Sequence, residues 1–179
     1  MMDIVFPNNN EHNFIEIASK LGYTSLCFVY CLKDFQNKLL EPSINLKYGV
    51  ICSEKDIAKA KKLTDLIFVK SSENPRHLVE SNKNITIFDF EQNPKKDMFT
   101  QRRSGLNHIL CDLAVKNNIT IGFSFNSLLK ADIKQRNVLL GRMSANLDLC
   151  KKYKNKVIFA SFTEDPYEMR SYKDLKTFF

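Results

Sequence analysis

Short apolar runs alternate with amphipathic segments along this chain, and the two patterns predict different elements. Runs of four to eight apolar or β-branched residues predict strands at 3–6, 25–31, 47–52, 66–69, 85–90, 119–123 and 156–162. Apolar residues recurring every three or four positions predict helices over 11–21, from Ser53, from Pro75, over 133–153 and over 166–175. Residues 33–40 fit either a short helix or a loop.

The stretch 101–129 carries the clearest local signals. Ser104 is expected to cap a helix by accepting a backbone N–H bond from the first turn. Asn117 and Asn118 favour the left-handed conformation that ends helices, and a buried strand follows at 119–123. The residues expected on the inner face of this helix are Leu106, Ile109, Leu110, Leu113 and Ala114.

Strands that alternate with helices are typical of an α/β fold with a parallel sheet, since each crossover helix returns the chain to the same end. Two arrangements satisfy the pattern: a compact barrel related to the TIM barrel, and an open doubly wound sheet. Periodicity leaves both open. No linker or internal repeat divides the chain, so we predict one domain over 1–179.

Charge narrows the range of partners. The 179 residues include 27 Lys and Arg against 20 Asp and Glu, a formal net charge of +7. This excess favours a polyanionic partner, and RNA, DNA or an acidic protein each fit it. We find no signal peptide and no apolar run of membrane-spanning length, and expect a cytoplasmic protein whose five cysteines are reduced and buried.

Catalytic motifs are sparse. A metal hydrolase takes three or more converging ligands per site, whereas His12, His77 and His108 stand far apart in the sequence. Cys111 follows His108 by three residues, and we interpret Cys111 as a core residue rather than a nucleophile. Asp89 lies at a strand end, where catalytic groups of barrels gather; we expect it instead to bond neighbouring backbone or a loop arginine.

Arginines cluster at the joints between predicted elements. Arg102 and Arg103 precede a helix N-terminus, whose N–H groups also attract anions. They form either a phosphate site or ion pairs with Asp89 or Glu91. Arg136 and Arg142 are six residues apart on one helix, so they point about 120° apart and need not serve one ligand.

Three segments carry a resemblance to a known family: 103–111 (RSGLNHILC), 121–125 (IGFSF) and 136–153 (RNVLLGRMSANLDLCKKY). They resemble protein component 3 of archaeal ribonuclease P, whose family includes the eukaryotic thirty-kilodalton subunit. A similar Pro-x-x-x-Arg helix stands at Pro166 to Arg170. The likeness is densest over 102–170, and before residue 100 only the strand–helix order and the Asn-rich start agree.

The resemblance implies an α/β TIM-like compact barrel, related to metal-dependent phosphoesterases of the polymerase-and-histidinol-phosphatase type. It implies a subunit that supports RNA-catalysed, magnesium-dependent removal of 5′ leaders from precursor tRNA. The chain itself is then expected to hold no catalytic residue, metal or cofactor, with the magnesium at the RNA. Its implied partners are the ribonuclease P RNA, component 2 and the other protein subunits, with precursor tRNA as the substrate of the whole enzyme.

Basic residues within the segments that family members use are the expected RNA contacts, together with Lys70 and Arg170 from our own interpretation. The expected RNA-binding residues are Arg102, Arg103, His108, Lys116, Arg136, Arg142, Lys70 and Arg170. Residues 126–129 and the exposed side of the 133–153 helix are expected to meet the partner protein. Two alternatives remain: a diverged metal-dependent phosphoesterase, and a non-catalytic barrel that binds only proteins.

Overall fold

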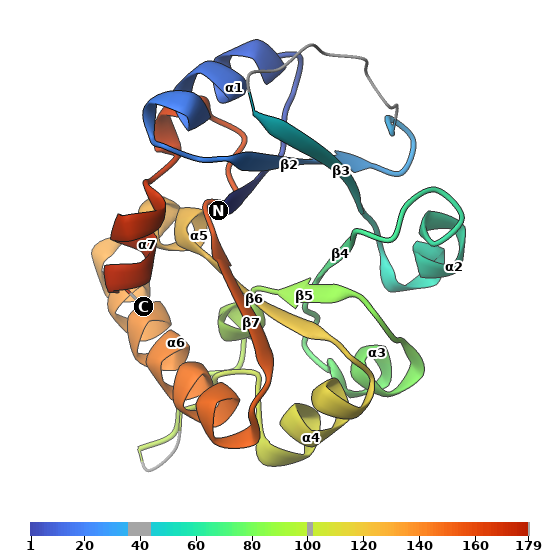
Figure 1. Cartoon of the computed structure of the whole chain (residues 1–179). Helices are drawn as coiled ribbons and strands as arrows, with labels where there is room; N and C mark the ends of the chain where they lie inside the picture. The colour runs from blue at the N-terminus through green and yellow to red at the C-terminus, as the bar shows by residue number, and fades with distance from the viewer. Residues whose placement is uncertain (36–43, 100–101, 179) are drawn as a thin grey trace. The chain divides into compact units, whose positions relative to one another are not determined.

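Seven strands and seven α-helices make up the described part of the chain, which in this computed structural model comprises residues 1–35, 44–99 and 102–178 (Figure 1). The strands are β1 (Met2–Val5), β2 (Ser25–Cys31), β3 (Asn45–Ile51), β4 (Ile67–Lys70), β5 (Thr86–Phe88), β6 (Thr120–Ser124) and β7 (Lys156–Ala160). The helices are α1 (Glu11–Lys20), α2 (Ile57–Ala60), α3 (Arg76–Ser81), α4 (His108–Lys116), α5 (Phe125–Lys130), α6 (Ile133–Tyr153) and α7 (Tyr172–Phe178). Of the ambiguous 33–40 segment, residues 36–40 lie outside the described residues.

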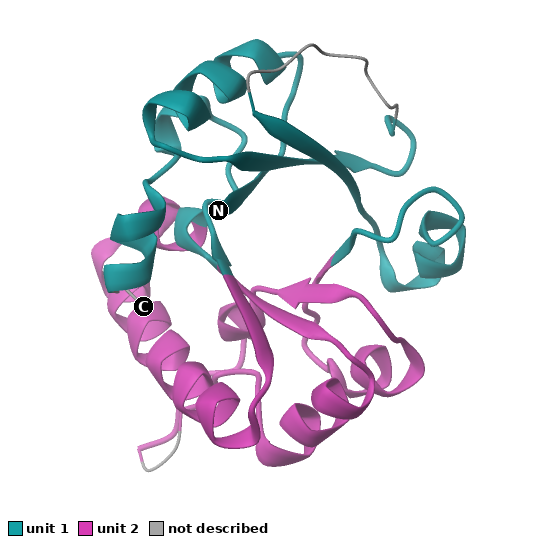
Figure 2. Cartoon of the chain, in the orientation of Figure 1, with its two compact units in different colours: residues 1–68, 124–126, 159–179 teal, residues 69–123, 127–158 magenta. Residues whose placement is uncertain are grey.

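Two compact units group these elements, shown in different colours in Figure 2. The first contains residues 1–68, 124–126 and 159–179, and the second contains residues 69–123 and 127–158. The sequence-based expectation of one domain over 1–179 stays a prediction.

Strand pairing separates the two sheet arrangements that the sequence left open. The strands are hydrogen-bonded in chain order, β1 to β7, and the registers of β1–β2, β2–β3, β3–β4 and β5–β6 are all parallel. After β7 the chain pairs with β1, where Val5 and Thr163 form a parallel bridge. A doubly wound sheet reverses its strand order at a switch point, whereas this order continues from last to first, as in a β/α barrel. The predicted fold class is confirmed.

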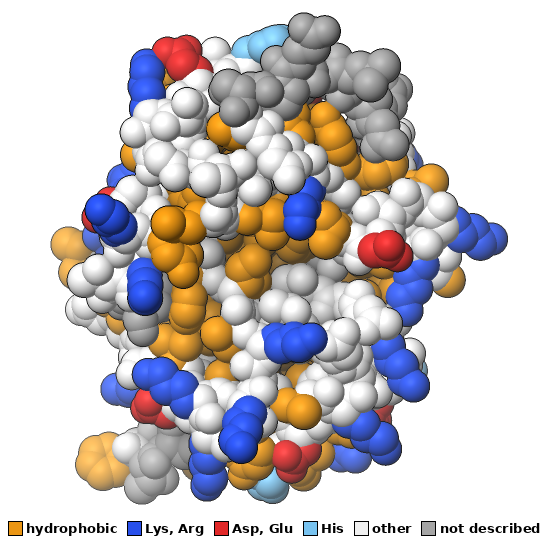
Figure 3. Space-filling view, in the orientation of Figure 1, with side chains coloured by type: hydrophobic (Ala, Val, Ile, Leu, Met, Phe, Trp, Pro, Cys, Tyr) orange, Lys and Arg blue, Asp and Glu red, His pale blue; other side chains and the backbone are white. Residues whose placement is uncertain are grey.

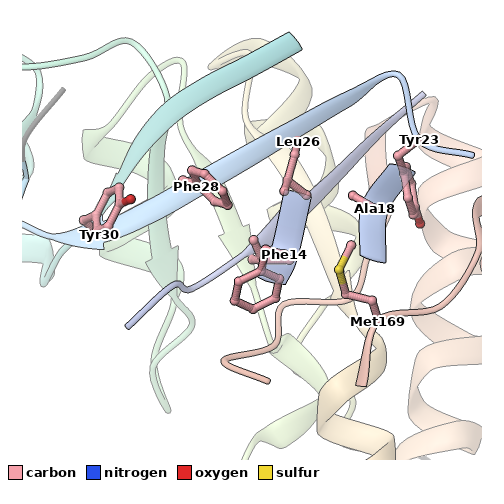
Figure 4. Packing of buried hydrophobic residues seen from close by; sticks show 8 residues of the cluster. Phe14, Ala18, Tyr23, Leu26, Phe28, Tyr30 and Met169 are labelled. Carbon is pink, nitrogen blue, oxygen red and sulfur yellow. The ribbon is translucent and has the colours of Figure 1, made fainter. Parts of the chain in front are cut away.

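The core of the first unit forms where α1 lies on β2 (Figure 4). Phe14 of α1 packs edge-on against Phe28 of β2, with ring centroids 6.4 Å apart. Tyr23, Leu26, Tyr30 and Met169 extend this cluster. Burying an aromatic ring of this size contributes on the order of 2 kcal/mol, so the cluster ties α1 and residue 169 to the sheet.

Helix packing organises the second unit. The helix α4 packs against both α3 and α6, so its buried residues Leu110, Cys111 and Ala114 face inward. Asn117, at the end of α4, donates from its side chain to the carbonyl of Val79 at 2.7 Å. The next residue, Asn118, has φ +52°, which confirms the predicted two-asparagine end of this helix.

The start of α4 differs from the sequence prediction. The capping side chain is Asn107, whose Oδ1 accepts from Leu110 N at 2.9 Å, and the helix begins at His108 rather than after Ser104. Ser104 is buried, and its carbonyl accepts from Asn146 of α6 at 2.9 Å. Ile109 is exposed, contrary to its expected inward position, because the buried face of α4 is formed by Leu110, Cys111 and Ala114.

Other boundaries were also wrong. The fifth strand ends at Phe88, and Asp89 takes a left-handed conformation with φ +62°. Residues 126–129, which are expected to meet the partner protein, lie within α5. The predicted 166–175 helix is a short 3₁₀ turn over Pro166–Glu168 followed by α7. Cys31 is exposed and Cys52 half-buried, whereas Cys27, Cys111 and Cys150 are buried as expected. No helix among the described residues is long and apolar enough to cross a membrane.

Candidate nucleic-acid interface

Arg142 of α6 is a buried arginine that fixes the surface segment 91–97. Its Nε donates to Asp97 Oδ1 at 2.8 Å, and its Nη2 lies 2.7 Å from the same oxygen. Its remaining N–H groups donate to the backbone carbonyls of Glu91, Asn93 and Lys95 at 2.6–3.0 Å. A guanidinium can serve these acceptors together because it presents five donors in one plane. The segment is therefore held rigidly, and this guanidinium has little surface left for a ligand.

Asp97 joins this anchor to the arginines ahead of α4. Its Oδ1 also accepts from the backbone N–H of Arg103 at 2.9 Å. Burial acts to raise the pKa of Asp97, but the hydrogen bonds from Arg142 and Arg103 outweigh it, and the net pKa lies below the ordinary value. The carboxylate stays ionised at neutral pH, so the contact between 91–97 and Arg103 persists there.

Arg102 and Arg103 are exposed and have different contacts. The Nη1 of Arg102 donates to the carbonyl of Gly141 at 2.8 Å, and Arg103 Nη2 lies 3.5 Å from Met98 Sδ. Their predicted alternative, ion pairing with Asp89 or Glu91, is wrong. Both guanidinium groups keep exposed N–H donors directed at solvent, which phosphate oxygens can occupy.

His108 and Lys116 are the first and last residues of α4, and both are exposed. Eight helical steps separate them by about 12 Å along the axis. A ligand that reaches both must therefore be extended, as a nucleic-acid backbone is. A single phosphate cannot span that distance.

Lys70 and Asp89 pair at the carboxyl ends of β4 and β5. The ammonium lies 3.2 Å from Asp89 Oδ2, and Ser127 of α5 donates to Asp89 Oδ1 at 2.8 Å. The expectation that neighbours hold Asp89 was right, but the partners are a lysine and a serine rather than backbone or an arginine. Lys70 therefore presents a partly neutralised charge, although its side chain is half exposed.

Glu91 lies close to this pair and is buried. Neither carboxylate oxygen has a hydrogen-bond partner among the described residues. Burial, and then the charge of Asp89, raises the pKa of Glu91 to about 8. The side chain is therefore mostly protonated at neutral pH, and it adds little negative charge near the basic residues.

Arg136 and Arg170 bind backbone carbonyls. Arg136 donates to Leu128, Leu129 and Ala131 at 2.9–3.2 Å and so links α6 to the end of α5. Arg170 donates to Met169 at 2.8 Å and lies 5.7 Å over the ring of Phe125. As the 120° separation predicts, Arg136 and Arg142 serve different groups.

The structure brings Arg102, Arg103 and Arg142 together around the 91–97 segment of the second unit. Arg170 belongs to the first unit. Figure 3 shows Lys and Arg at many separate points on the face in view rather than in one dense cluster. The RNA-binding role of the eight expected residues stays a prediction.

Metal-hydrolase chemistry has no ligand set among residues 1–35, 44–99 and 102–178, where no group of three or more His, Cys, Asp or Glu side chains converges. His12, His77 and His108 are each exposed. The Asp89 and Glu91 pair lies where catalytic groups of barrels gather, but one is neutralised by Lys70 and the other is mostly protonated. The phosphoesterase alternative therefore has no support here.

Sequence reasoning missed Asp97 and Ser127 as positioning residues. Asp97 acts on Arg142, 45 residues away, and Ser127 acts on Asp89, 38 residues away. Nothing local to either residue indicates its partner. The burial of Arg142 was missed for the same reason. Its neighbours in the sequence have an ordinary helical pattern and do not indicate that this arginine is buried.

A family model and individual relatives both place this chain among ribonuclease P proteins. The family described as RNase P subunit p30 matches residues 95–179. Over 99% of this chain and 82% of the relative, the sequence is 30% identical to ribonuclease P protein component 3 of Methanococcus maripaludis strain C5. It is 27% identical to the protein of that name from Methanococcus vannielii, over 98% of this chain and 70% of the relative.

A solved structure also resembles this one. A chain in the cryo-EM structure of archaeal ribonuclease P with mature tRNA superposes with a TM-score of 0.76. The match covers 99% of this chain and 80% of that chain, at 20% sequence identity. At this identity the likeness shows a shared fold.

Proposed function

Because this chain belongs to the family of ribonuclease P protein component 3, we propose that it is a protein subunit of ribonuclease P, the endoribonuclease that removes 5′ leaders from precursor tRNA. Family membership carries this proposal, and the exposed arginines beside the 91–97 segment supply a physical role. The whole enzyme is a nuclease; this chain alone breaks no bond.

Charge neutralisation is the proposed mode of action. Each Lys or Arg that meets a phosphate releases condensed counterions, which stabilises a folded RNA whose own phosphates repel one another. Arg102, Arg103, His108 and Lys116 are exposed and are the contacts we favour. Arg142 contributes indirectly, since its N–H groups already hold the 91–97 segment in place.

Magnesium and partners follow from the same proposal. The RNA subunit binds the catalytic magnesium, and this chain binds no cofactor of its own. Its partners are the ribonuclease P RNA, protein component 2 and the other protein subunits, with precursor tRNA as the substrate of the assembled enzyme. Its proposed location is the cytoplasm.

Reconstitution tests the proposal. Precursor-tRNA cleavage is measured with the RNA and the other subunits, with and without this chain, across a range of magnesium concentrations. We expect omission to raise the magnesium concentration required and to slow cleavage. An unchanged rate and magnesium requirement would show that the chain is not a working subunit.

Two substitutions localise the effect. Arg103→Ala removes an exposed arginine beside α4, whereas Lys61→Ala removes an exposed lysine that follows α2. We expect Arg103→Ala to weaken activity at low magnesium several-fold and Lys61→Ala to have little effect. Equal effects would mean that the chain acts through overall charge rather than through this site.

A further inference from the structure

Phe99 is an aromatic side chain that the structure leaves fully exposed. Met98, the residue before it, is also more than half exposed. Removing apolar area from water contributes about 25 cal/mol per Å², so a ligand that covers this ring gains binding free energy from it.

The segment that presents this ring is held rigidly. Arg142 fixes the carbonyls of residues 91, 93 and 95, and Asp97 is tied to both Arg142 and the Arg103 backbone. Phe99 follows this anchored segment by two residues. The Sδ of Met98 lies 3.5 Å from Arg103 Nη2. An aromatic residue that directly follows an anchored segment loses less conformational entropy when a ligand covers it than one on a free chain.

The surroundings of Phe99 are basic. Lys96, Arg102 and Arg103 are exposed close by in the sequence, and Asp97, the acidic residue among them, is engaged by Arg142. Aromatic residues and arginine occur both in protein–protein interfaces and in sites for single-stranded nucleic acid, but the centres of protein–protein interfaces are depleted of lysine, whereas nucleic-acid sites use it to bind phosphates. The charge therefore favours RNA over a protein partner.

We propose that Phe99 is a stacking platform for one unpaired nucleobase of an RNA strand, whose phosphates bind Lys96, Arg102 and Arg103. Unpaired bases can leave the helical stack and lie flat on an aromatic face, while the flanking phosphates meet cations. This inference rests on the proposed function, since it names the part of the RNA that this surface contacts.

Fluorescence provides the direct test, because the chain contains no tryptophan. Phe99→Trp places a single indole at the site, and a stacked base quenches its emission. We expect single-stranded RNA to quench this variant, and an abasic RNA of the same length to leave its emission unchanged. Tyr167→Trp, at a residue that is 79% exposed in the first unit, is the matched control and should show no base-dependent quenching.

Affinity provides the second test, made on the full chain at two salt concentrations. Phe99→Leu keeps an apolar side chain and loses the aromatic face, so we expect about a tenfold weaker affinity for single-stranded RNA with an unchanged salt slope. Tyr167→Leu should bind as the parent chain does. Arg103→Ala should reduce the salt slope, because it removes a phosphate contact.

The outcomes separate the two proposals. Stacking is wrong if Phe99→Leu binds RNA as the parent chain does and RNA does not quench Phe99→Trp. If Arg103→Ala nevertheless binds RNA more weakly than the parent chain, the proposed function stands. If Phe99→Leu weakens binding of another protein subunit and leaves RNA affinity unchanged, Phe99 is a protein contact and the proposal is overturned. A parent chain that binds no RNA at either salt concentration would overturn both proposals.

Discussion

The guanidinium of Arg102 lies directly on the backbone of Gly141, in the middle of α6. Its Nη1 donates to the Gly141 carbonyl at 2.8 Å, and a Cβ added to Gly141 would stand 2.8 Å from Arg102 Cζ. Glycine inside a helix costs about 0.5–1 kcal/mol relative to alanine. The close approach of Arg102 gives a physical reason for a glycine at this place.

Gly141→Ala should therefore separate stability from RNA binding. The alanine favours the helix and displaces the flexible end of Arg102, so we expect unchanged or slightly higher stability, by up to about 1 kcal/mol. RNA affinity should fall about as far as in Arg102→Ala. Thermal unfolding and a binding titration measure the two effects, with the exposed α6 substitution Ser144→Ala as the control. An unchanged RNA affinity in Gly141→Ala would mean that Arg102 binds RNA without its hydrogen bond to the Gly141 carbonyl.

Arg142→Met should destabilise the second unit. Methionine fills a similar volume but leaves three backbone carbonyls and the partly exposed Asp97 without the donors of Arg142, and a buried polar group left without a partner costs about 1–3 kcal/mol. Hydrogen exchange should also show faster exchange of the Arg103 amide, which donates to Asp97. Arg76→Met, which removes an exposed pair with Glu80, should change stability by less than about 1 kcal/mol. Similar losses in both variants would contradict the anchoring role of Arg142.

Gly105→Ala should be among the more damaging single substitutions. Gly105 has φ +85°, and an added Cβ would stand 2.1 Å from the carbonyl oxygen of Phe90. The left-handed backbone costs about 1–2 kcal/mol for alanine, and relieving the clash with a backbone atom adds about 1–3 kcal/mol. Gly22→Ala is the matched control, because Gly22 has φ +78° with nothing within 4 Å of the added carbon. Denaturant unfolding should show a larger loss in the free energy of unfolding for Gly105→Ala than for Gly22→Ala. Equal losses would mean that the backbone at Phe90 and Gly105 can move apart without cost.

Glu91 should make stability depend on pH. Its pKa is about 8 in the folded chain and 4.5 without burial, so between these values the folded state keeps a proton that the unfolded state releases. Stability is then fully present below about pH 4.5 and falls as pH rises towards 8, by on the order of 1 kcal/mol per pH unit. Urea unfolding from pH 6.5 to 8 measures this slope, and Glu91→Gln should flatten it.

Asp3 provides the control for that measurement. Burial raises its pKa to about 6, against hydrogen bonds from Ser161 and Ile4 that lower it. Asp3 also makes the free energy of unfolding fall as pH rises, but this fall ends near pH 6. Asp3→Asn should therefore keep the slope between pH 6.5 and 8 that Glu91→Gln removes. A slope that survives in Glu91→Gln would assign it to another group.

Local patterns predicted the elements whose signals are contained within a few residues. The strand at 25–31 and the helix at 133–153 have the expected bounds, and the two asparagines end α4 as expected. Apolar periodicity and a cap residue suffice there, because each acts within one or two turns of chain.

The start of α4 shows the limit of such patterns. Ser104 and Asn107 are both good capping residues, and the sequence alone does not rank them. In the structure Asn107 is the cap, and Ser104 is instead held through its backbone carbonyl by Asn146, 42 residues away in the chain. Asp89 is a second example: the strand before it ends at Phe88, and its side chain binds Lys70 and Ser127, partners that the local sequence does not reveal.

By itself, the sequence determined the alternation of strands and helices, the positive charge and the family, because each is contained in local spacing, residue counts or short motifs. The tertiary structure alone decided which arginines face solvent and which one is buried. That choice depends on carbonyls and carboxylates 39 to 51 residues away in the chain, which only folding brings within hydrogen-bonding distance.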